Sequence, residues 1–408
     1  MKLLIYSHYF APSLGGVENV VRKLATGLAS PPFGGNPPEF EVVVVTQTGR
    51  GAFDDSTLPF PVVRKPGIFR LTRLIRNSDV VHLAGPALLP LFLTRLIHKP
   101  IVVEHHGYQA ICPNGSLLLQ PEAEVCPGHF QAGHFRTCFR CQRSEFPAVR
   151  SARTLFLTGL RGWLCKDAEN LAISPHVTDR LSSVFHSQVV YYGIEDPRPQ
   201  IVPKGVGPGF VSRICFAYVG RFVSEKGIPV LLDAARQVLS EGLTFDLLLI
   251  GDGPDREKLQ NRILKNGLDS CTRITGFLQG AALNDVLENV HAVVMPSICE
   301  ETAGLAAIEQ MMRGRLVIAS SIGGLANVVG DTGMLFTPRD AAALASCIKA
   351  VIREPELIVQ FGGKARQRAL ELFTYPRMLE EHAQVYRRHL QRSSRTFQAT
   401  PADKHHPS

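Results

Sequence analysis

Residues 296–309 read PSICEETAGLAAIE and follow a short apolar run, HAVVM, at 291–295. The apolar run predicts a strand and the residues from Leu305 predict a helix, so Glu301 and Glu309 bracket a strand-to-helix turn. Gly304 permits close backbone approach at this turn. Open α/β sheets bind ligands at such an edge, and paired carboxylates beside helix amides suit a ligand with sugar hydroxyls and phosphate. Helix capping by acidic residues is the alternative explanation.

Two series of short β-rich runs alternate with helical periodicity along most of the chain. Strands are expected near residues 3–7, 41–46, 79–84, 101–104, 170–174 and 188–192, and again near 214–219, 245–250, 273–276, 291–295, 316–320 and 334–336, with early helices near 16–29, 87–97 and 175–185. This alternation predicts parallel sheets with right-handed crossovers. The expected fold is α/β, with two doubly wound, Rossmann-like domains facing a cleft.

The domain limits follow from changes in composition. The first domain is expected at 1–195, a Pro- and Gly-rich linker at 196–210, and the second domain at 211–375. A helix at 376–392 is expected to pack back on the first domain, and the polar residues 393–408 are expected to be disordered.

Composition and charge narrow the class of protein. The 408 residues are 45% hydrophobic and 20% charged, which describes a folded protein too long for one core. Residues 1–7 lack the features of a signal peptide, and the apolar stretch 80–97 is interrupted by polar residues and prolines, so we expect a cytoplasmic protein without a membrane span.

The net charge of +8 is unevenly distributed, with seven Lys or Arg and one acid, Glu145, between Gln131 and Lys166. Affinity for an anionic membrane and a merely solvated basic face both explain this excess. A helix near 149–164 alternates Arg150, Arg153 and Arg161 with large apolar residues. Contact with a membrane surface, serving a lipid-linked acceptor, and ordinary packing of an amphipathic helix on its own domain both explain this pattern. Nucleic acid is disfavoured because no recognition signature is present.

Two further loops contain residues that are suited to bind a phosphate group. Residues 219–227, VGRFVSEKG, leave the first strand of the second domain, and Arg221 and Lys226 there suit charge that develops on a departing phosphate. Gly15 and Gly16 open the first helix, where backbone amides can approach an anion. Solvated surface cations and a tight turn are the alternatives. No G-x-G-x-x-G pattern occurs here, which disfavours a nicotinamide cofactor.

Together these motifs resemble the GT4 retaining glycosyltransferases of the GT-B fold, from Met1 to about Tyr386. Glu301 and Glu309 match the family's E-x7-E motif, and residues 220–227 match its G-R-x3-E-K-G sequence. The resemblance implies that Glu301 and the Gly304–Leu305 amides orient the donor sugar and that Glu309 binds the nucleotide ribose. It also implies that Arg221 and Lys226 grip the donor diphosphate.

The resemblance extends to the first domain, where Gly15 and Gly16 would meet the diphosphate and His106 of EHHG 104–107 would lie near the sugar. A position at the core edge or surface is the alternative for His106. The sequence departs from the family pattern at Ala326, Asn327 and Tyr192, which replace Pro, Glu and Asn. These departures leave the donor open.

The resemblance implies transfer of a sugar, with retention, from a nucleotide sugar to a glycan or lipid-linked acceptor in polysaccharide or glycoconjugate biosynthesis. The basic segment and the 149–164 helix add an expected peripheral contact at the inner face of the membrane. No catalytic metal is expected, because the chain lacks an Asp-x-Asp motif and Asp54–Asp55 looks like an isolated surface pair. The alternatives are a catalytically silent relative that binds sugar nucleotides and a phosphorylase-type GT-B enzyme.

An irregular segment at 108–145 contains four of the nine cysteines. Cys112, Cys126, Cys138 and Cys141 supply the donor set of a structural zinc site, with His129 and His134 as possible substitutes. An iron–sulfur or redox role and unliganded thiols are the alternatives. A subset of GT4-like enzymes carries a similar cysteine-containing insert.

Overall fold

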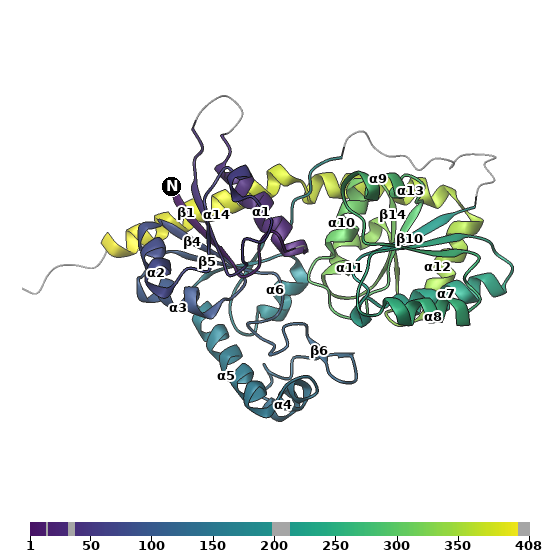
Figure 1. Cartoon of the computed structure of the whole chain (residues 1–408), viewed down its shortest axis with the longest axis horizontal. Coiled ribbons are helices and arrows are strands. Elements are labelled where there is room, and N and C mark those ends of the chain that lie inside the picture. The colour runs from purple at the N-terminus through teal and green to yellow at the C-terminus, as the bar shows by residue number, and fades with distance from the viewer. Residues whose placement is uncertain (14, 32–36, 198–212, 399–408) are drawn as a thin grey trace, which may run out of the picture.

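The chain folds into two α/β domains, each built around one parallel sheet (Figure 1). The computed structural model describes residues 1–13, 15–31, 37–197 and 213–398. The N-terminal sheet has the strand order β3-β2-β1-β4-β5-β8-β9 and the C-terminal sheet the order β12-β11-β10-β13-β14-β15. All neighbouring strands in both sheets pair in parallel. The predicted fold class, with two doubly wound domains, is confirmed.

The N-terminal domain contains the strands β1 (Lys2–Ser7), β2 (Glu41–Thr46), β3 (Val62–Arg64), β4 (Val80–Ala84), β5 (Ile101–His105), β8 (Glu169–Ala172) and β9 (Gln188–Val189). Its helices are α1 (Gly16–Ala29), α2 (Ile68–Asn77), α3 (Leu88–Leu96), α4 (Phe135–Arg143), α5 (Ala148–Cys165) and α6 (Pro175–Leu181). The cysteine insert adds a small hairpin of β6 (Leu118–Leu119) and β7 (Glu124–Val125). The sequence analysis did not predict β3 or α2.

The C-terminal sheet consists of β10 (Cys215–Val219), β11 (Asp246–Ile250), β12 (Thr272–Gly276), β13 (Ala292–Met295), β14 (Leu316–Ser320) and β15 (Met334–Phe336). The helices are α7 (Ile228–Ser240), α8 (Arg256–Lys265), α9 (Gly280–Leu287), α10 (Leu305–Met312), α11 (Gly323–Val329), α12 (Ala341–Arg353), α13 (Glu356–Leu372) and α14 (Tyr375–Gln398). None of the helices in the described part of the chain is long and apolar enough to cross a membrane.

Strand order determines where a ligand can bind. In each sheet the first strand pairs with the second strand on one side and with a later strand, β4 or β13, on the other. The order therefore reverses beside β1 and beside β10, and the loops that leave the carboxyl ends of these strands diverge and open a crevice. The loops after β1, β10 and β13 are the ones that carry the glycine, cation and carboxylate motifs.

Helix α14 joins the two domains. It leaves the C-terminal domain and runs back along the N-terminal domain, as the yellow helix in Figure 1 shows. The Tyr375 hydroxyl donates to the Lys23 carbonyl of α1 at 2.7 Å, and the Tyr386 hydroxyl lies 3.0 Å from His82 Nδ1. The helix continues to Gln398, so the predicted disordered tail from 393 was wrong for 393–398. Residues 399–408 and most of the predicted linker, 198–210, lie outside the described residues.

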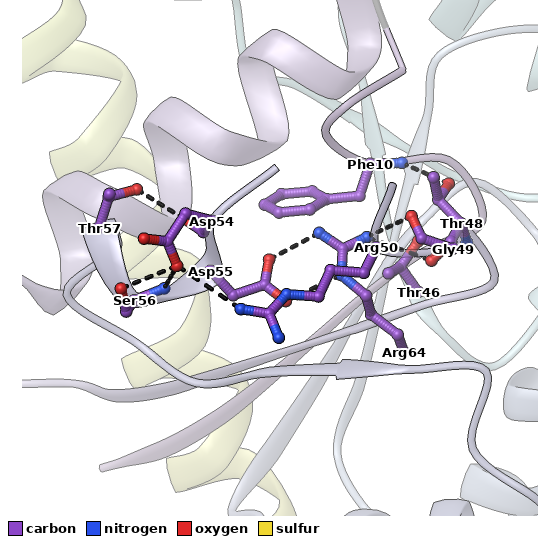
Figure 2. Close-up of polar contacts among 10 residues, drawn as sticks. All are labelled: Phe10, Thr46, Thr48, Gly49, Arg50, Asp54, Asp55, Ser56, Thr57 and Arg64. Atoms are coloured by element: carbon purple, nitrogen blue, oxygen red, sulfur yellow. Dashed lines mark hydrogen bonds and ion pairs between the residues drawn. The ribbon is translucent and has the colours of Figure 1, made fainter. Parts of the chain in front are cut away.

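An arginine orders the loop that follows β2, beside the loop that follows β1 (Figure 2). Arg64 binds both carboxylate oxygens of Asp55, at 2.9 and 2.7 Å, and donates to the carbonyls of Thr48 and Gly49. The Phe10 amide in turn donates to Thr48 Oγ1 at 3.0 Å, which links the two loops. The sequence analysis expected Asp54–Asp55 to be an isolated surface pair. That expectation was wrong for Asp55, because Arg64 binds its carboxylate.

A carboxylate and three histidines are buried beneath the carboxyl ends of β4 and β5. Glu104 is 1% exposed, and its carboxylate lies 3.4 Å from the Nε2 atoms of His82 and His106 and 3.5 Å from that of His382 on α14. Burial disfavours the Glu104 carboxylate, but the nearby histidines hold its pKa well below the usual value. Burial lowers the pKa of His82 and His106, whereas Glu104 outweighs burial at His382 and raises its pKa.

We expect the free energy of unfolding to fall as the pH drops from about 6.5 toward 4.5. Burial lowers the pKa of His82, His106 and His105, that of His105 to about 4, so the folded state binds fewer protons than the unfolded chain over this range. Each contributes a slope of up to about 1.4 kcal/mol per pH unit. The raised pKa of His382 changes the free energy of unfolding only above this pH range, where that free energy falls as the pH rises. The lowered pKa of Glu104 changes it only below the range, where it falls as the pH drops.

Urea unfolding across a pH series measures this slope. His105→Gln removes one buried titrating group, so its slope should be shallower, whereas His186→Gln on the exposed surface is the control. A free energy of unfolding that does not change between these pH values would contradict the prediction.

Candidate functional site

A left-handed glycine ends the turn between β13 and α10. Gly304 has φ 74°, a conformation that favours glycine, and it is the residue before the first turn of α10. Glu301 precedes it in the loop, and Glu309 follows it on the helix. Burial raises the pKa of Glu309, against the lowering effect of Arg313 and of Lys23 from the N-terminal domain. The structure thus confirms a strand-to-helix turn with the two glutamates on either side.

The loop that leaves β10 packs tightly against this turn. Gly227 has φ 65°, and a Cβ there would lie 1.9 Å from the Pro296 carbonyl oxygen. The Ile298 amide donates to the Glu225 carbonyl at 3.0 Å. Only glycine fits at 227, and the close approach that it permits brings Lys226 beside Glu301.

Lys226 and Glu301 form a shielded ion pair. Lys226 Nζ lies 2.9 Å from Glu301 Oε1, with side chains 22% and 9% exposed, and the Ser297 hydroxyl donates to the same oxygen. Burial opposes both charges, yet the pair and the hydroxyl hold the pKa of Glu301 below its usual value and raise that of Lys226. Both groups are therefore charged at neutral pH.

Arg221 does not take part in this ion pair. Its side chain is 76% exposed and lies 3.9 Å from Glu225, while its backbone carbonyl accepts from the buried Tyr218 hydroxyl at 2.8 Å. The backbone of Arg221 is thus fixed at the end of β10 and its guanidinium extends into solvent. It is available to an anion without breaking a strong contact.

Gly15 and Gly16 reach the turn from the other domain. A Cβ on Gly16 would lie 2.7 Å from Leu305 Cδ1, so the N-terminus of α1 stands directly against the first residue of α10. Gly15 is in extended backbone and caps the helix without a side chain. The glycine loop of the N-terminal domain therefore contacts Leu305, which follows Glu301 of the ion pair in the same turn.

His106 contacts the turn by its backbone and not by its ring. The Thr302 hydroxyl donates to the His106 carbonyl at 3.2 Å. The ring is buried, with Nδ1 2.6 Å from the Tyr192 hydroxyl and Nε2 3.4 Å from Glu104. Both ring nitrogens thus face groups of the N-terminal domain. Tyr192, noted only as a departure from the family pattern, is the partner of this histidine.

Sequence analysis missed the residues that join the 300–302 loop to the N-terminal domain. Arg180 of α6 binds both carboxylate oxygens of Glu300, and His176 Nε2 lies 3.1 Å from Glu300 Oε2. The buried Tyr108 hydroxyl donates to the Glu300 carbonyl at 3.3 Å, and Ser174 Oγ to the Thr302 carbonyl at 2.6 Å. No local pattern in the sequence marks these partners, because 120 or more residues separate each pair.

Asn327 also contributes to this junction. Its Oδ1 accepts from the His176 amide at 2.8 Å, so the residue that replaces the family's glutamate binds the first turn of α6. A Cβ on Gly324, one turn earlier, would lie 2.0 Å from the Thr302 carbonyl oxygen. The start of α11 therefore presses on the same loop that carries Glu301.

The four insert cysteines are all buried, between 6% and 8% exposed, and none is in a disulfide. Cys112 Sγ donates to Asn114 Oδ1 at 2.9 Å, and the Gln120 amide donates to Cys141 Sγ at 3.3 Å. Burial first, and then the other three thiols, raise the pKa of Cys138 to about 12. Across the described ranges, no three His, Cys, Asp or Glu side chains have an arrangement that fits a metal ion. In the described conformation, the insert cysteines are therefore not arranged to coordinate a metal ion.

A cavity of about 810 Å³ lies at the opposite edge of the C-terminal sheet. Arg213, Asp246 and Asp269 are among the residues that line it, at the amino ends of the strands. None of the predicted site residues lines this cavity, and the strand order gives no crevice there.

We expect Gly324→Ala to destabilise the fold by about 1–3 kcal/mol, because the added methyl group must displace the Thr302 backbone. Gly363→Ala on α13 is the matched control, since nothing lies within 4 Å of its Cβ. That change should stabilise the helix by about 0.5–1 kcal/mol. Urea unfolding measures both effects, and an equal free energy of unfolding for the two variants would contradict the close contact between α11 and the 300–302 loop.

Comparisons with known proteins show which family part of the chain resembles. Residues 213–354 match the model of the family described as glycosyl transferases group 1. The chain is 28% identical over 246 residues to glycogen synthase of Mycobacterium tuberculosis, and the match covers 58% of each protein. The chain thus spans somewhat over half the length of this relative.

Two further likenesses cover nearly the whole chain. The O-antigen chain mannosyltransferase C of Escherichia coli is 23% identical over 400 residues, which cover 94% of this chain and 97% of that one. The crystal structure of Anabaena HepE in complex with UDP and glucose superposes with a TM-score of 0.69 at 18% identity, over 94% of this chain and 99% of that one. At this identity the superposition shows the fold alone. Residues 213–354 thus match the glycosyl transferases group 1, and the chain as a whole has the GT-B fold.

Proposed function

We propose that the protein is a GT4-type retaining glycosyltransferase that moves a sugar from a nucleotide-sugar donor to an acceptor. The observation that carries the proposal is the Lys226–Glu301 ion pair, which lies in the loops that follow β10 and β13, on the turn whose Leu305 contacts the glycine loop of the other domain. The names of relatives that act on sugars, and the UDP and glucose of the HepE complex, support it.

The ion pair suits a donor with a diphosphate and a sugar. The diphosphate presents negative charge to Lys226, and the sugar hydroxyls donate to Glu301, so a bound donor replaces one charge-assisted contact by two. Arg221 extends into solvent and can close on the diphosphate, while Glu309 on α10 accepts from the ribose. The amides at the N-terminus of α1 add partial positive charge from the first domain.

Transfer breaks the bond between the anomeric carbon and the diphosphate oxygen and forms a bond from that carbon to an acceptor hydroxyl oxygen, whose proton passes to the departing diphosphate. The negative charge that develops on this oxygen is stabilised by Lys226 and Arg221, which are fixed cations in a site partly shielded from water. Retention of configuration follows from the resemblance of the E-x7-E turn. The His106 ring, held by Tyr192 and Glu104, acts on the site through the position of its backbone carbonyl.

The acceptor is a glycan or a lipid-linked glycan of polysaccharide or glycoconjugate biosynthesis, and it binds on the N-terminal domain. Two relatives whose names place them in glycogen and O-antigen synthesis support a polymer acceptor. The reaction takes place in the cytoplasm, at the inner face of the membrane. No catalytic metal takes part, because cations of the protein carry the charge on the diphosphate.

We expect Lys226→Ala to lower kcat for transfer by about 10²–10³-fold, the usual loss when one fixed group that stabilises developing charge is removed. Lys258→Ala is the control, because that lysine is 82% exposed on α8 and pairs only with Asp255 nearby. The measurement is release of nucleoside diphosphate from UDP-, GDP- and ADP-sugars, with thermal unfolding to show that both variants fold. An absence of turnover with every donor in the wild type would leave a silent sugar-nucleotide-binding relative, and dependence on inorganic phosphate a phosphorylase.

Structural zinc on the insert cysteines is a second part of the proposal. The four buried thiols form the right donor set, although they would have to approach one another more closely than in the described conformation. We expect about one zinc per purified chain, lost together with thermal stability in Cys138→Ser/Cys141→Ser and retained in the control Cys347→Ser on α12. Metal-free protein with unchanged stability in the double variant would show that the thiols bind no metal.

A further inference from the structure

Exposed apolar side chains gather on one side of the N-terminal domain. Of the fifteen large hydrophobic residues that are exposed in the described parts of the chain, nine lie on α2, α3, α4 and α5. These nine are Ile68, Phe69, Leu89, Phe92, Leu96, Phe135, Val149, Phe156 and Trp163. Neighbouring helices of this set are in contact, α2 with α3, α3 with α5 and α5 with α4, and they follow one another along one side of the domain in Figure 1.

The exposed residues follow helical spacing. On α3, Leu89, Phe92 and Leu96 stand at i, i+3 and i+7 and are 47–63% exposed. On α5, Val149, Phe156 and Trp163 stand seven residues apart and are 83%, 72% and 59% exposed. Residues at these spacings share one face of a helix, so both helices present an apolar stripe outward as well as the one that packs inward.

The same four helices carry ten arginines and no Asp or Glu. Eight of the arginines are exposed: Arg70, Arg73, Arg76, Arg136, Arg140, Arg143, Arg150 and Arg153. Elsewhere the acids nearly balance the bases, since the whole chain has 44 Lys and Arg against 36 Asp and Glu. The exposed residues of α2, α3, α4 and α5 are called the basic-apolar face below.

An apolar groove opens on this face beside α5. It has a volume of about 470 Å³ and is lined by Phe130, Phe135, Phe156 and Trp163 together with small and aliphatic residues of α5. Arg95 lies 5.5 Å from the centre of the Trp163 ring. Aromatic side chains with arginines beside them are suited to the boundary between lipid headgroups and acyl chains.

We propose that the basic-apolar face binds the surface of an anionic lipid bilayer. Charge decides between the possible occupants: eight exposed arginines, against Glu145 and Asp167 in the loops on either side of α5, attract anionic headgroups, whereas two copies of this face would repel each other. The apolar stripes of α3 and α5 and the groove lie in the acyl boundary, while the arginines of α2, α4 and α5 contact the headgroups. No spanning helix is needed, since the protein lies on the membrane.

The proposal stands independently of the donor chemistry. The basic-apolar face is built from helices of the N-terminal domain, and the Lys226–Glu301 pair belongs to loops of the C-terminal domain. Binding to vesicles and release of nucleoside diphosphate are thus separate measurements. Lys226→Ala should leave vesicle binding unchanged, and variants of the face should retain turnover in free solution.

Co-sedimentation of the full chain with vesicles tests the proposal. The vesicles contain phosphatidylcholine alone or phosphatidylcholine with phosphatidylglycerol. We expect binding to the anionic vesicles only, weakened by added salt. Arg70→Gln/Arg73→Gln/Arg76→Gln should weaken it about fivefold for each charge removed. Phe156→Ser/Trp163→Ser should also reduce binding by about tenfold or more, because two aromatic anchors are lost.

Matched controls lie on the other domain. Leu264→Ser and Val359→Ser remove residues that are 61% and 52% exposed on α8 and α13, and Arg353→Gln removes an exposed arginine of α12. These changes should leave vesicle binding as in the wild type. Equal binding to neutral and anionic vesicles, or equal loss in the face and control variants, would overturn the proposal. A wild-type dimer in light scattering that Phe156→Ser/Trp163→Ser converts to a monomer would show instead that the face joins two copies.

Discussion

The junction between the 300–302 loop and the N-terminal domain is the contact on which the site depends. Glu300 is 8% exposed and is held by Arg180 and His176, while Thr302 and its carbonyl bind His106 and Ser174. Removal of one partner from a buried pair costs about 3–5 kcal/mol, so the loop is not free to leave this position alone. Because Glu301 lies between these anchored residues, its carboxylate is placed relative to both domains at once.

That placement explains why a cation and a carboxylate can share so small a volume. Lys226 is carried by a loop whose Gly227 backbone touches Pro296, so the ammonium group is set by backbone contact and not by a flexible side chain alone. Under the proposed function, neither of the two paired charges needs to move far to accept a ligand, and little reorganisation opposes the charge that develops in the reaction. The ion pair thus fixes the Lys226 and Glu301 side chains relative to each other.

How much of this was predictable follows from the range of each interaction. The turn at Glu301, Gly304 and Glu309 and the parallel sheets depend on local periodicity and on single glycines, which a sequence displays directly. The partners of Glu300 come from α6, 120 residues earlier, and the direction of the His106 ring depends on Tyr192, which is 86 residues away. Helix α2 was missed because three arginines interrupt its short apolar pattern, and only Leu71 and Ile75 of the helix are buried.

One packed segment of the N-terminal domain connects the basic-apolar face to the 300–302 loop. Gly162 of α5 packs so closely against the backbone of Ala110 that a Cβ there would lie 3.0 Å from the Ala110 carbonyl oxygen. Two residues earlier, the Tyr108 hydroxyl donates to the Glu300 carbonyl, next to Glu301. Under the two proposals above, a bilayer on this face would lie one packed segment away from the Glu301 carboxylate. An acceptor held in the membrane would need to reach only past this segment to meet the donor, which gives a physical reason for the arginines and aromatics to lie on this side of the domain.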